Sequence, residues 1–226
     1  MRLRPPPAPR LAALAAAGLV LLLGPAAARA PRCPADMVRV PGLAACIDRF
    51  EASLGPGARG EADGQAMKAK AISRAGARPA VKVSHHQAKA ACALAGKRLC
   101  RRAEWTAACR GGDAGRRYPY GMKYQKKRCH DRPLAKQRGV VAPLPTGSLQ
   151  GCRTPAGVYD LSGNVWEWLA DTGPDGNPAD LVGGGFGNDD SEGSLLACVS
   201  SSRLGQPATQ QREEIGFRCC ADLVGP

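Results

Sequence analysis

Ten cysteines constrain the fold of this 226-residue chain more than any other feature of its sequence. An even number of cysteines in an exported chain predicts up to five disulfides. Zinc binding is the alternative, but zinc ligands usually come as matched Cys-x2-Cys pairs or with His-x3-His, and those spacings are absent. We therefore expect a disulfide-stapled domain, with cysteines at positions 33, 46, 92, 100, 109, 129, 152, 198, 219 and 220.

Residues 1–30 are typical of a secretory signal peptide. Three arginines precede the apolar run Leu11–Leu23, and a small-x-small sequence ends at Ala30, where we expect cleavage. The run is too short to span a bilayer comfortably, so a retained anchor is the lesser alternative. Pro31 and Arg32 before Cys33 are a poor lipoprotein signal. We expect a periplasmic or secreted protein with no stable membrane anchor and one domain over residues 31–226.

Charge is distributed unevenly along the chain. Removing the first thirty residues lowers the basic count from 32 to 28 against 19 acidic residues, which leaves a net charge of +9. Residues 97–138 carry 14 basic and three acidic side chains, whereas residues 160–226 carry three and eleven. The two halves could face each other, the basic half could bind an anionic partner, or the charges could simply be solvated. The basic region has few aromatic residues, so we do not expect a nucleic-acid partner.

Local patterns predict little regular structure. Ser84 and Gln87 form a capping box that opens a helix to about Ala95, which Gly96 ends. A second helix is expected over residues 102–110, before Gly111 and Gly112, with no helical period after it. Short strands are expected over residues 37–40 and 45–47, and residues 55–78 look like a loop. The pattern favours an α+β domain with much irregular structure.

The segment Val158–Trp168 combines a possible cation site with core residues. Asp160 and Glu167 flank a Ser-Gly-Asn turn, and carboxylates with backbone carbonyls are the ligands that calcium prefers. Trp166 and Trp168 follow the turn directly, and we expect Trp166 in the core rather than in the wall of a groove.

Several blocks occur in the order typical of one family. They are Met37–Pro41, Ile47–Glu51, Ala95–Leu99, Ala103–Trp105, Tyr118–Gly121, Gly157–Trp168 and Ile215–Cys219. With them the chain resembles the formylglycine-generating enzyme, or sulfatase-modifying-factor, family. The resemblance implies a C-type-lectin-like variant of the α+β class and bound calcium. In active members it also implies copper-dependent oxidation of a cysteine in an exported sulfatase to formylglycine.

The resemblance also implies a ligand set for calcium. It comprises the side chains of Asp160 and Glu167 and the carbonyls of Gly163 and Val165. The alternative is that Asp160 caps a turn and Glu167 pairs with an arginine. A second calcium site of the family would fall between Cys129 and Thr154, where Asp131 is the single acid, so we do not expect that site.

Two disulfides follow from the resemblance, Cys92 with Cys219 and Cys109 with Cys198. Cys33 with Cys46 and Cys129 with Cys152 are expected as local pairs, which leaves Cys100 and Cys220. We further expect Arg218 to pair with a carboxylate.

The reactive cysteine pair of the family is missing. Active members carry two cysteines after a Gly-Gly-Ser-aromatic stretch, and their thiolates bind Cu(I), a soft ion. Here Gly185 matches the serine, Asn188 or Asp190 matches the first cysteine, and the second falls within residues 192–195. We therefore expect no copper. The groove near this site should include Gly185, Phe186, Asn188 and Arg203.

The three histidines offer no clear replacement. His85 and His86 are adjacent on a helix and point about 100° apart, so they cannot easily share a metal, and we expect all three, His130 included, at the solvated surface. The sequence thus favours a calcium-binding module for a peptide, glycan or protein partner. The alternatives are a formylglycine-generating or related metal-dependent oxidase, and a structural subunit of an active homologue. The oligomeric state stays open.

Overall fold

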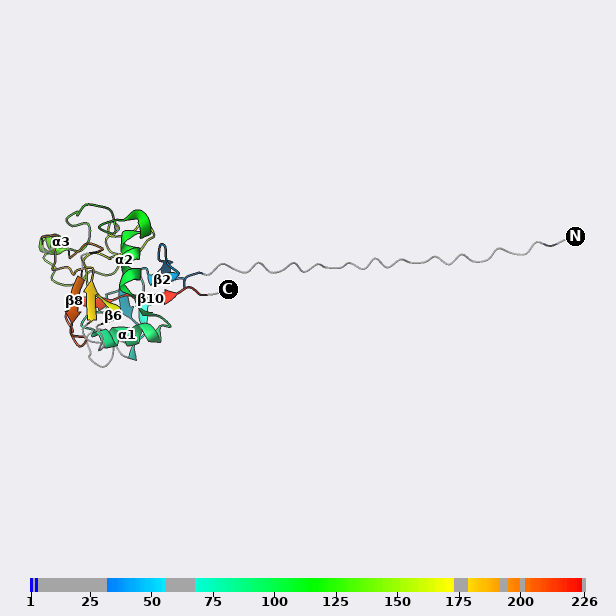
Figure 1. Ribbon diagram of the computed structural model, residues 1–226, viewed down its shortest axis with the longest axis horizontal. Coiled ribbons are helices and arrows are strands. Elements are labelled where there is room, and N and C mark those ends of the chain that lie inside the picture. The colour runs from blue at the N-terminus through cyan, green and yellow to red at the C-terminus, as the bar shows by residue number, and fades with distance from the viewer. Residues whose placement is uncertain are drawn as a thin grey trace.

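Three small β-sheets and three short α-helices form the regular structure of the described part of the chain (Figure 1). The computed structural model describes residues 1, 3, 32–55, 68–172, 179–191, 195–199 and 202–224. The expected signal segment 1–30 and its cleavage site at Ala30 lie outside the described residues, apart from Met1 and Leu3. Every helix among the described residues is too short or too polar to cross a bilayer.

The first sheet has the strand order β1-β2-β10-β5, and all of its pairs are antiparallel. The third has the order β8-β7-β6-β9, in which β6 pairs parallel with β9. The two-stranded sheet β3-β4 falls between β2 and β5 in sequence. The strands are β1 (Met37–Arg39), β2 (Ala45–Asp48), β3 (Ala52–Leu54), β4 (Ala71–Ser73), β5 (Arg98–Leu99), β6 (Trp166–Thr172), β7 (Ala179–Val182), β8 (Ser202–Gln206), β9 (Ile215–Phe217) and β10 (Cys219–Asp222).

The helices begin and end where their capping residues dictate. In α1 (His85–Leu94) the Ser84 hydroxyl accepts the Gln87 N–H, and the Gln87 side chain accepts the Ser84 N–H at 2.8 Å. α2 (Arg102–Arg110) ends at Gly111, whose φ of 71° suits glycine, before the short 3-10 helix η2 (Gly112–Ala114). Both helices match the predicted ones.

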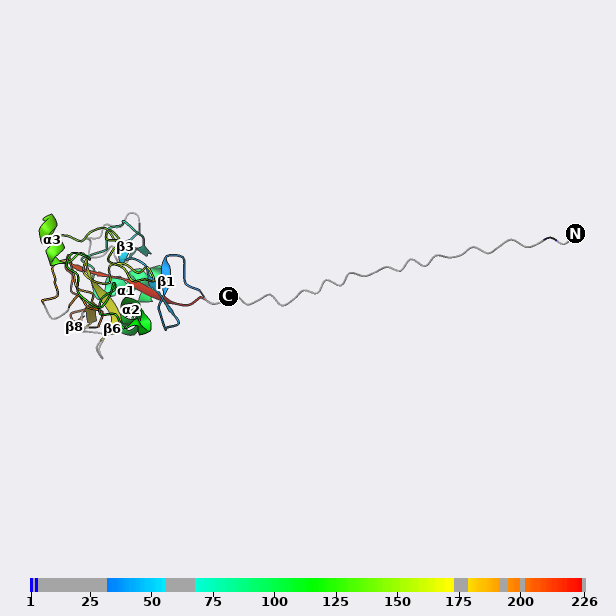
Figure 2. The ribbon, with the colours of Figure 1, turned by 90° about the horizontal axis from the view of Figure 1, so that it is seen from above.

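The sequence patterns predicted β1, β2, α1 and α2, and they missed the other strands, η2 and α3 (Arg132–Arg138). β4 lies inside the stretch 55–78 that we expected to be a loop, where it pairs with β3. α3 follows the second predicted helix, where no helical period was found. It is set by Asp131 as N-cap, Pro133 in its first turn and Gly139 at its end. α3 lies at the outer edge of the folded body, at the opposite end from β1 (Figures 1 and 2).

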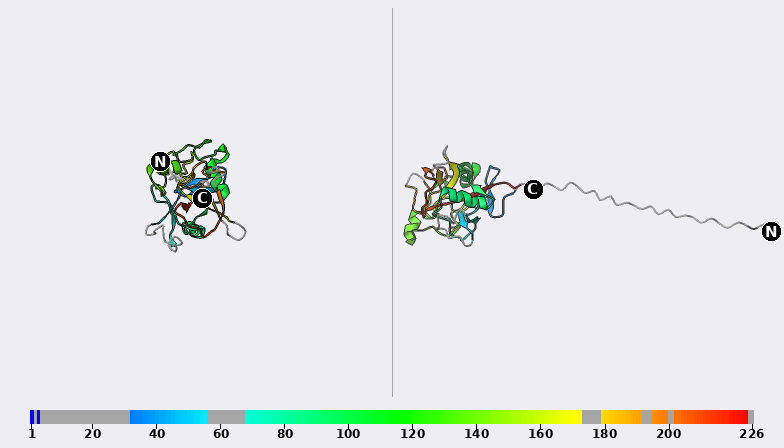
Figure 3. Two further views of the ribbon diagram at one scale, coloured as in Figure 1. Left: turned by 90° about the vertical axis from the view of Figure 1, so that its left-hand side faces the viewer. Right: turned by 90° about the horizontal axis from the view of Figure 1, so that it is seen from below.

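Two buried apolar clusters lie under the helices. One gathers Trp166, Trp168 and Phe217 against the small residues of α1, and the other gathers Trp105, Leu161 and Leu169 beneath α2. α1 faces the viewer when the molecule is seen from below (Figure 3). Trp166 is fully buried, as we expected, so its indole anchors the core.

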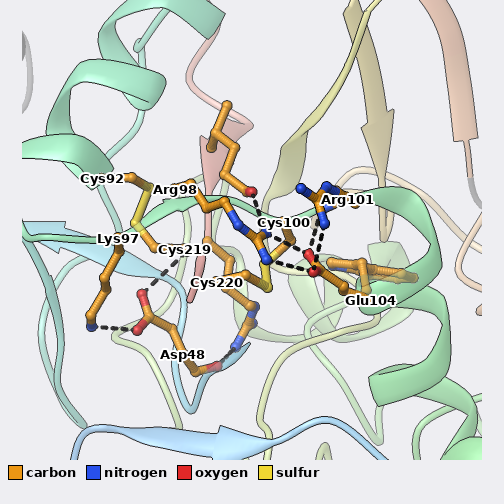
Figure 4. Close-up of a disulfide and its surroundings, with 12 residues drawn as sticks. Asp48, Cys92, Lys97, Arg98, Cys100, Arg101, Glu104, Cys219 and Cys220 are labelled. Carbon is orange, nitrogen blue, oxygen red and sulfur yellow. Dashed lines mark hydrogen bonds and ion pairs between the residues drawn. A yellow bond between two sulfur atoms is a disulfide. The ribbon is translucent and has the colours of Figure 1, made fainter. Parts of the chain in front are cut away.

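All ten cysteines form disulfides, and β10 carries two of them side by side. Cys219 pairs with Cys92 of α1, and Cys220 pairs with Cys100 at the start of α2 (Figure 4). The remaining pairs are Cys33–Cys46, Cys109–Cys198 and Cys129–Cys152. Four of the five are the pairs expected from the sequence, and the fifth, Cys100–Cys220, joins the two cysteines left over. The two bonds of β10 tie α1 and the segment before α2 to this C-terminal strand.

Candidate functional site

The turn between Asp160 and Trp166 owes its shape to three residues with left-handed backbone. Asp160 has φ 59°, Gly163 has φ 79° and Asn164 has φ 61°. Asp, Asn and Gly are the residue types that adopt this conformation at least cost. A Cβ on Gly163 would lie 2.4 Å from the His130 carbonyl oxygen, so only glycine fits there. The turn therefore presses against the chain that leads into α3.

Glu167 lies in a buried ion pair with Arg218. The Arg218 Nε lies 3.1 Å from both carboxylate oxygens, and its terminal nitrogen donates to Glu167 Oε1 at 2.9 Å. The indole N–H of Trp105 donates to Glu167 Oε2 at 2.7 Å. Both side chains of the pair are essentially inaccessible to solvent. The expectation that Arg218 pairs with a carboxylate is confirmed.

Asp160 and Glu51 complete a cluster of three buried carboxylates around this one guanidinium. Asp160 accepts the Gly147 N–H at 2.7 Å and so closes a turn. Glu51 accepts the Asn164 side-chain amide and the Val165 N–H, the latter at 3.2 Å. The sequence reasoning did not assign Glu51 a role, although it ends one of the blocks that carry the resemblance.

Burial perturbs the acids of this cluster. Burial raises the pKa of Glu51 well above its usual range, and the charges of Asp160 and Glu167 raise it further. Burial also raises the pKa of Asp160 to about 6, against the opposing effects of the Gly147 N–H and Arg218. With all three acids ionised, one guanidinium leaves the cluster with a formal charge of −2.

Some features of this cluster favour calcium binding and others oppose it. The excess negative charge and the oxygen-rich turn are what a divalent cation requires. Against this, both Glu167 oxygens already accept hydrogen bonds from Arg218 and Trp105. No group of three or more His, Cys, Asp or Glu side chains in the described part of the chain is placed to hold a metal ion. Calcium at Asp160, Gly163, Val165 and Glu167 stays a prediction.

The glycine-rich turn after β7 is closed by Asn188. Its side-chain oxygen accepts the Gly185 N–H at 2.9 Å, and its own N–H donates to the Gly185 carbonyl at 3.0 Å. Gly185, Phe186 and Asn188 are buried. A Cβ on Gly185 would lie 3.2 Å from the Trp166 ring and 3.4 Å from the Cβ of Glu214. The side chain of Arg203, which lies in β8, is outside the described residues.

The next two residues of this loop are tied to the region around α3. Asp189 accepts from Arg132, with an Nε to Oδ2 distance of 2.9 Å, and its pKa lies at about 2 because Ser191 and Arg132 donate to it. The Tyr118 hydroxyl donates to Asp190. The positions that match the first copper ligand therefore carry oxygen-bearing side chains with protein partners.

Two of the three histidines are buried, so the prediction that all are solvated is wrong for them. His85 is 3 % exposed and its Nε2 lies 2.9 Å from the Leu169 carbonyl oxygen. His130 is 2 % exposed, its Nδ1 lies 3.1 Å from the Asn164 side-chain oxygen, and its ring stacks on Phe186. Burial lowers the pKa of both. Their partners are distant in sequence, so no local pattern predicts them. His86 is exposed, as expected.

Known proteins with similar sequences carry the same family name. The chain is 32 % identical over 156 residues to mouse Inactive C-alpha-formylglycine-generating enzyme 2, covering 66 % of this chain and 50 % of that protein. It is 31 % identical over 166 residues to mouse Formylglycine-generating enzyme, covering 64 % and 44 %. The chain thus spans about half the length of the curated relatives it matches.

Solved structures of more distant sequence share the fold. PvdO from Pseudomonas aeruginosa superposes with a TM-score of 0.55 at 21 % identity, covering 79 % of this chain and 80 % of that one. The Major Tropism Determinant I1 variant gives 0.54 at 14 % identity, covering 85 % and 54 %. The family profile described as Sulfatase-modifying factor enzyme 1-like domain matches residues 43–223. This α+β chain, with its buried Gly-Asn-Val-Trp-Glu-Trp turn, belongs to the FGE-sulfatase family.

Proposed function

We propose that this protein is an exported member of the family that binds calcium and a peptide, glycan or protein partner, and that does not carry out copper-dependent oxidation. The two mouse relatives do not decide the matter, because the chain is almost equally identical to the one named inactive and to the one named as the enzyme. The residues of the glycine-rich turn and its loop carry the argument.

The absence of a thiol pair is the observation that carries this proposal. The sequence has no cysteine between Gly185 and Cys198, and Cys198 is bonded to Cys109. Two-coordinate Cu(I) prefers two thiolates, and amide or carboxylate oxygens are poor substitutes. Asn188 meanwhile closes the turn with its side chain. The positions that hold the metal in active members thus serve the loop itself.

A shallow groove supports partner binding. It has a volume of about 920 Å³ and runs over the outer face of α2. Leu43, Ala107 and Val199 supply apolar walls, and Arg102 and Arg110 also line it. Val199 directly follows Cys198, so the groove borders the loop that has lost its cysteines. Grooves with apolar walls and a few charged groups are the usual form of binding sites.

Copper chemistry can be tested directly. The oxidised protein is titrated with Cu(I) under anaerobic conditions, and oxygen uptake is then followed with a cysteine-containing sulfatase peptide. We expect less than stoichiometric copper and no uptake above that of the peptide alone. A curated relative named Formylglycine-generating enzyme, assayed in parallel, serves as the positive control. Stoichiometric copper or iron with oxygen uptake would establish the alternative, a metal-dependent oxidase, which the 31 % identity to the mouse enzyme favours.

Calcium binding is tested by thermal unfolding with calcium and with a chelator. Calcium at about one hundred times its dissociation constant should stabilise the fold by about 2.7 kcal/mol. Asp160→Asn should weaken this response, and it should fold because asparagine also tolerates the positive φ at this position. Asp222→Asn, at an exposed acid in β10, is the matched control and should keep the response. An unchanged melting temperature on chelation would contradict the calcium site, and Glu167 would then serve only the ion pair with Arg218.

Export is supported by the five disulfides, since such bonds form and persist in oxidising compartments. Expression of the full chain with residues 1–30 should yield a shortened protein outside the cytoplasm. Sequencing of its N-terminus would locate the cut, which we place after Ala30.

A further inference from the structure

One face of the molecule is rich in cations, and the two acids beside it, Asp189 and Asp190, are bound to Arg132 and to the Tyr118 hydroxyl. Residues 115–139 contain nine Lys and Arg residues and a single acid, Asp131. Asp131 is 1 % exposed and both of its oxygens accept hydrogen bonds, so it presents no carboxylate to solvent. We define the basic face by six exposed side chains, which form no ion pair with any described residue: Lys123, Lys126, Lys127, Arg128, Lys136 and Arg138.

The structure gathers these cations from a loop and a helix. Asp131 caps α3 through the Leu134 N–H at 2.9 Å, and it also accepts the Lys127 N–H at 2.8 Å and the Tyr124 hydroxyl at 2.6 Å. The loop 122–128 is therefore held against the start of the helix that carries Lys136. Arg128 is fixed as well, because its Nε donates to the Gly151 carbonyl at 2.9 Å.

An exposed apolar side chain lies beside these cations. Tyr118 and Gly121 exchange backbone hydrogen bonds in a tight turn, and Met122 follows it with 63 % of its surface exposed. Lys123 comes next in the sequence. Tyr118 and Tyr120 stack beneath, with the Arg128 guanidinium 5.1 Å from the Tyr120 ring centre. An exposed apolar side chain next to a cluster of cations is an arrangement with which proteins dock on charged bilayers.

We propose that the basic face docks reversibly on an anionic phospholipid surface, with Met122 entering the interface between the headgroups. Cations alone would fit a soluble polyanion equally well, and the exposed thioether beside them favours the bilayer. α3 lies at the periphery of the molecule, so a flat surface can reach it (Figures 1 and 2). This inference is independent of copper, calcium and the groove over α2.

Vesicle co-sedimentation tests the charge requirement. The probes are vesicles of phosphatidylcholine alone and of phosphatidylcholine with phosphatidylglycerol. We expect binding only to the second, weakening as salt is added. Each cation near such a surface contributes roughly fivefold to partitioning, so the triple variant Lys123→Gln, Lys126→Gln, Lys127→Gln should lose roughly a hundredfold. The matched control changes the exposed Lys68, Lys70 and Lys89 to Gln, with the same change in net charge.

A second pair of variants tests insertion. Met122→Ser should lower partitioning several-fold, whereas Met122→Leu should retain it, because only the first removes apolar surface. All variants change exposed positions, and near-UV circular dichroism should show the native fold in each.

Three results would overturn the proposal. One is no binding to the anionic vesicles, including the case in which the protein is retained on a heparin column and so prefers a soluble polyanion. Another is equal loss in the two triple variants, which would show that net charge alone acts. The third is an unchanged affinity for Met122→Ser.

Discussion

Gly163 shows how tightly a single residue can be specified in this fold. Its φ of 79° already disfavours a side chain, and a Cβ there would lie 2.4 Å from a backbone oxygen that cannot easily move. Gly187, in the loop after β7, has open space around it and no such φ. The two glycines therefore form a matched pair.

Gly163→Ala should destabilise the protein by at least about 2 kcal/mol, the range for strained backbone combined with overpacking. Gly187→Ala should be neutral or slightly stabilising, because it only reduces the freedom of the unfolded chain. Urea unfolding of both variants checks this. Equal stabilities would show that the turn yields to the new side chain.

Asp48 gives the protein a pH dependence of defined sign. It is fully buried, and its carboxylate accepts from Lys97 at 2.6 Å and from the Cys219 N–H at 3.2 Å (Figure 4). Asp36 shares the same lysine. Burial raises its pKa from 3.8 to about 6, against the opposing effect of Lys97. The folded state binds the proton of Asp48 more tightly than the unfolded state does, so protonation of Asp48 stabilises the fold. This contribution to the free energy of unfolding is fully present below pH 3.8 and is lost as pH rises through about 6.

The free energy of unfolding should accordingly rise by up to about 3 kcal/mol on acidification through this interval, from Asp48 alone. Asp48→Asn should flatten this slope. Asp222→Asn should not, because hydrogen bonds from Arg98 lower the pKa of Asp222 and it titrates below the interval. Denaturant unfolding at several pH values measures the slopes, and parallel curves for wild type and Asp48→Asn would contradict the assignment.

At the scale of elements, α3 depends on one buried acid. Asp131 accepts from Leu134, Lys127 and Tyr124, so it joins the helix start to the preceding loop. Asp131→Ala removes the cap, worth about 1 kcal/mol, and also leaves two partly buried donors without this acceptor, at about 1 kcal/mol each. We expect a loss of at least 2 kcal/mol and faster amide exchange in residues 132–138. Asp131→Asn retains a capping oxygen and should lose less; an equal loss would show that charge rather than the cap matters.

The elements also show what the sequence can and cannot predict. α1 and α2 were predicted to within a residue because Ser84, Gln87, Gly96 and Gly111 are local signals with a local cause. β4 was missed because its strand exists through pairing with β3, a tertiary effect. α3 is too short to show a period, although Asp131, Pro133 and Gly139 were readable caps. The helix was therefore missed for lack of a period, although its capping residues stand in the sequence.

The same division holds at the candidate site. The ion pair of Arg218 was foreseen, since a buried arginine requires a carboxylate, but its sharing with Trp105 and the neighbouring Glu51 was not. These residues come from four separate segments, and only the fold brings them together. His85 and His130 were placed at the surface for the same reason: nothing near them in sequence reveals Leu169 or Asn164 as their partners.

At the scale of the whole molecule, the adjacent disulfides of β10 should act redundantly. Cys92–Cys219 and Cys100–Cys220 span 127 and 120 residues. With Cys109–Cys198 in place, the first of them to form closes a ring of about 40 residues, worth about 4 kcal/mol by loop entropy. The second then closes a ring of only about 9 residues, worth about 2.5 kcal/mol. Their contributions are therefore strongly non-additive.

Cys100→Ala with Cys220→Ala should cost about 2.5 kcal/mol, and so should removal of the Cys92–Cys219 pair. Removal of all four cysteines should cost about 6–7 kcal/mol. Deleting Cys33–Cys46, which spans 13 residues, is the control and should cost about 3 kcal/mol whether or not the others are present. Guanidinium unfolding gives the values. A cost near 4 kcal/mol for each single pair would show that the two do not share a loop.

The position of Cys219 and Cys220 has a consequence for biogenesis. A chain emerging from a translocation channel N-terminus first can close Cys33–Cys46 early, but both covalent links to β10 must wait until Phe217 and the two cysteines after it have emerged. Maturation of the first sheet is thus a late event, completed after almost all of the described chain has been delivered. A premature stop before Cys219 would remove both disulfides of that sheet at once. The thiols of Cys92 and Cys100 would then remain without their native partners in an oxidising compartment.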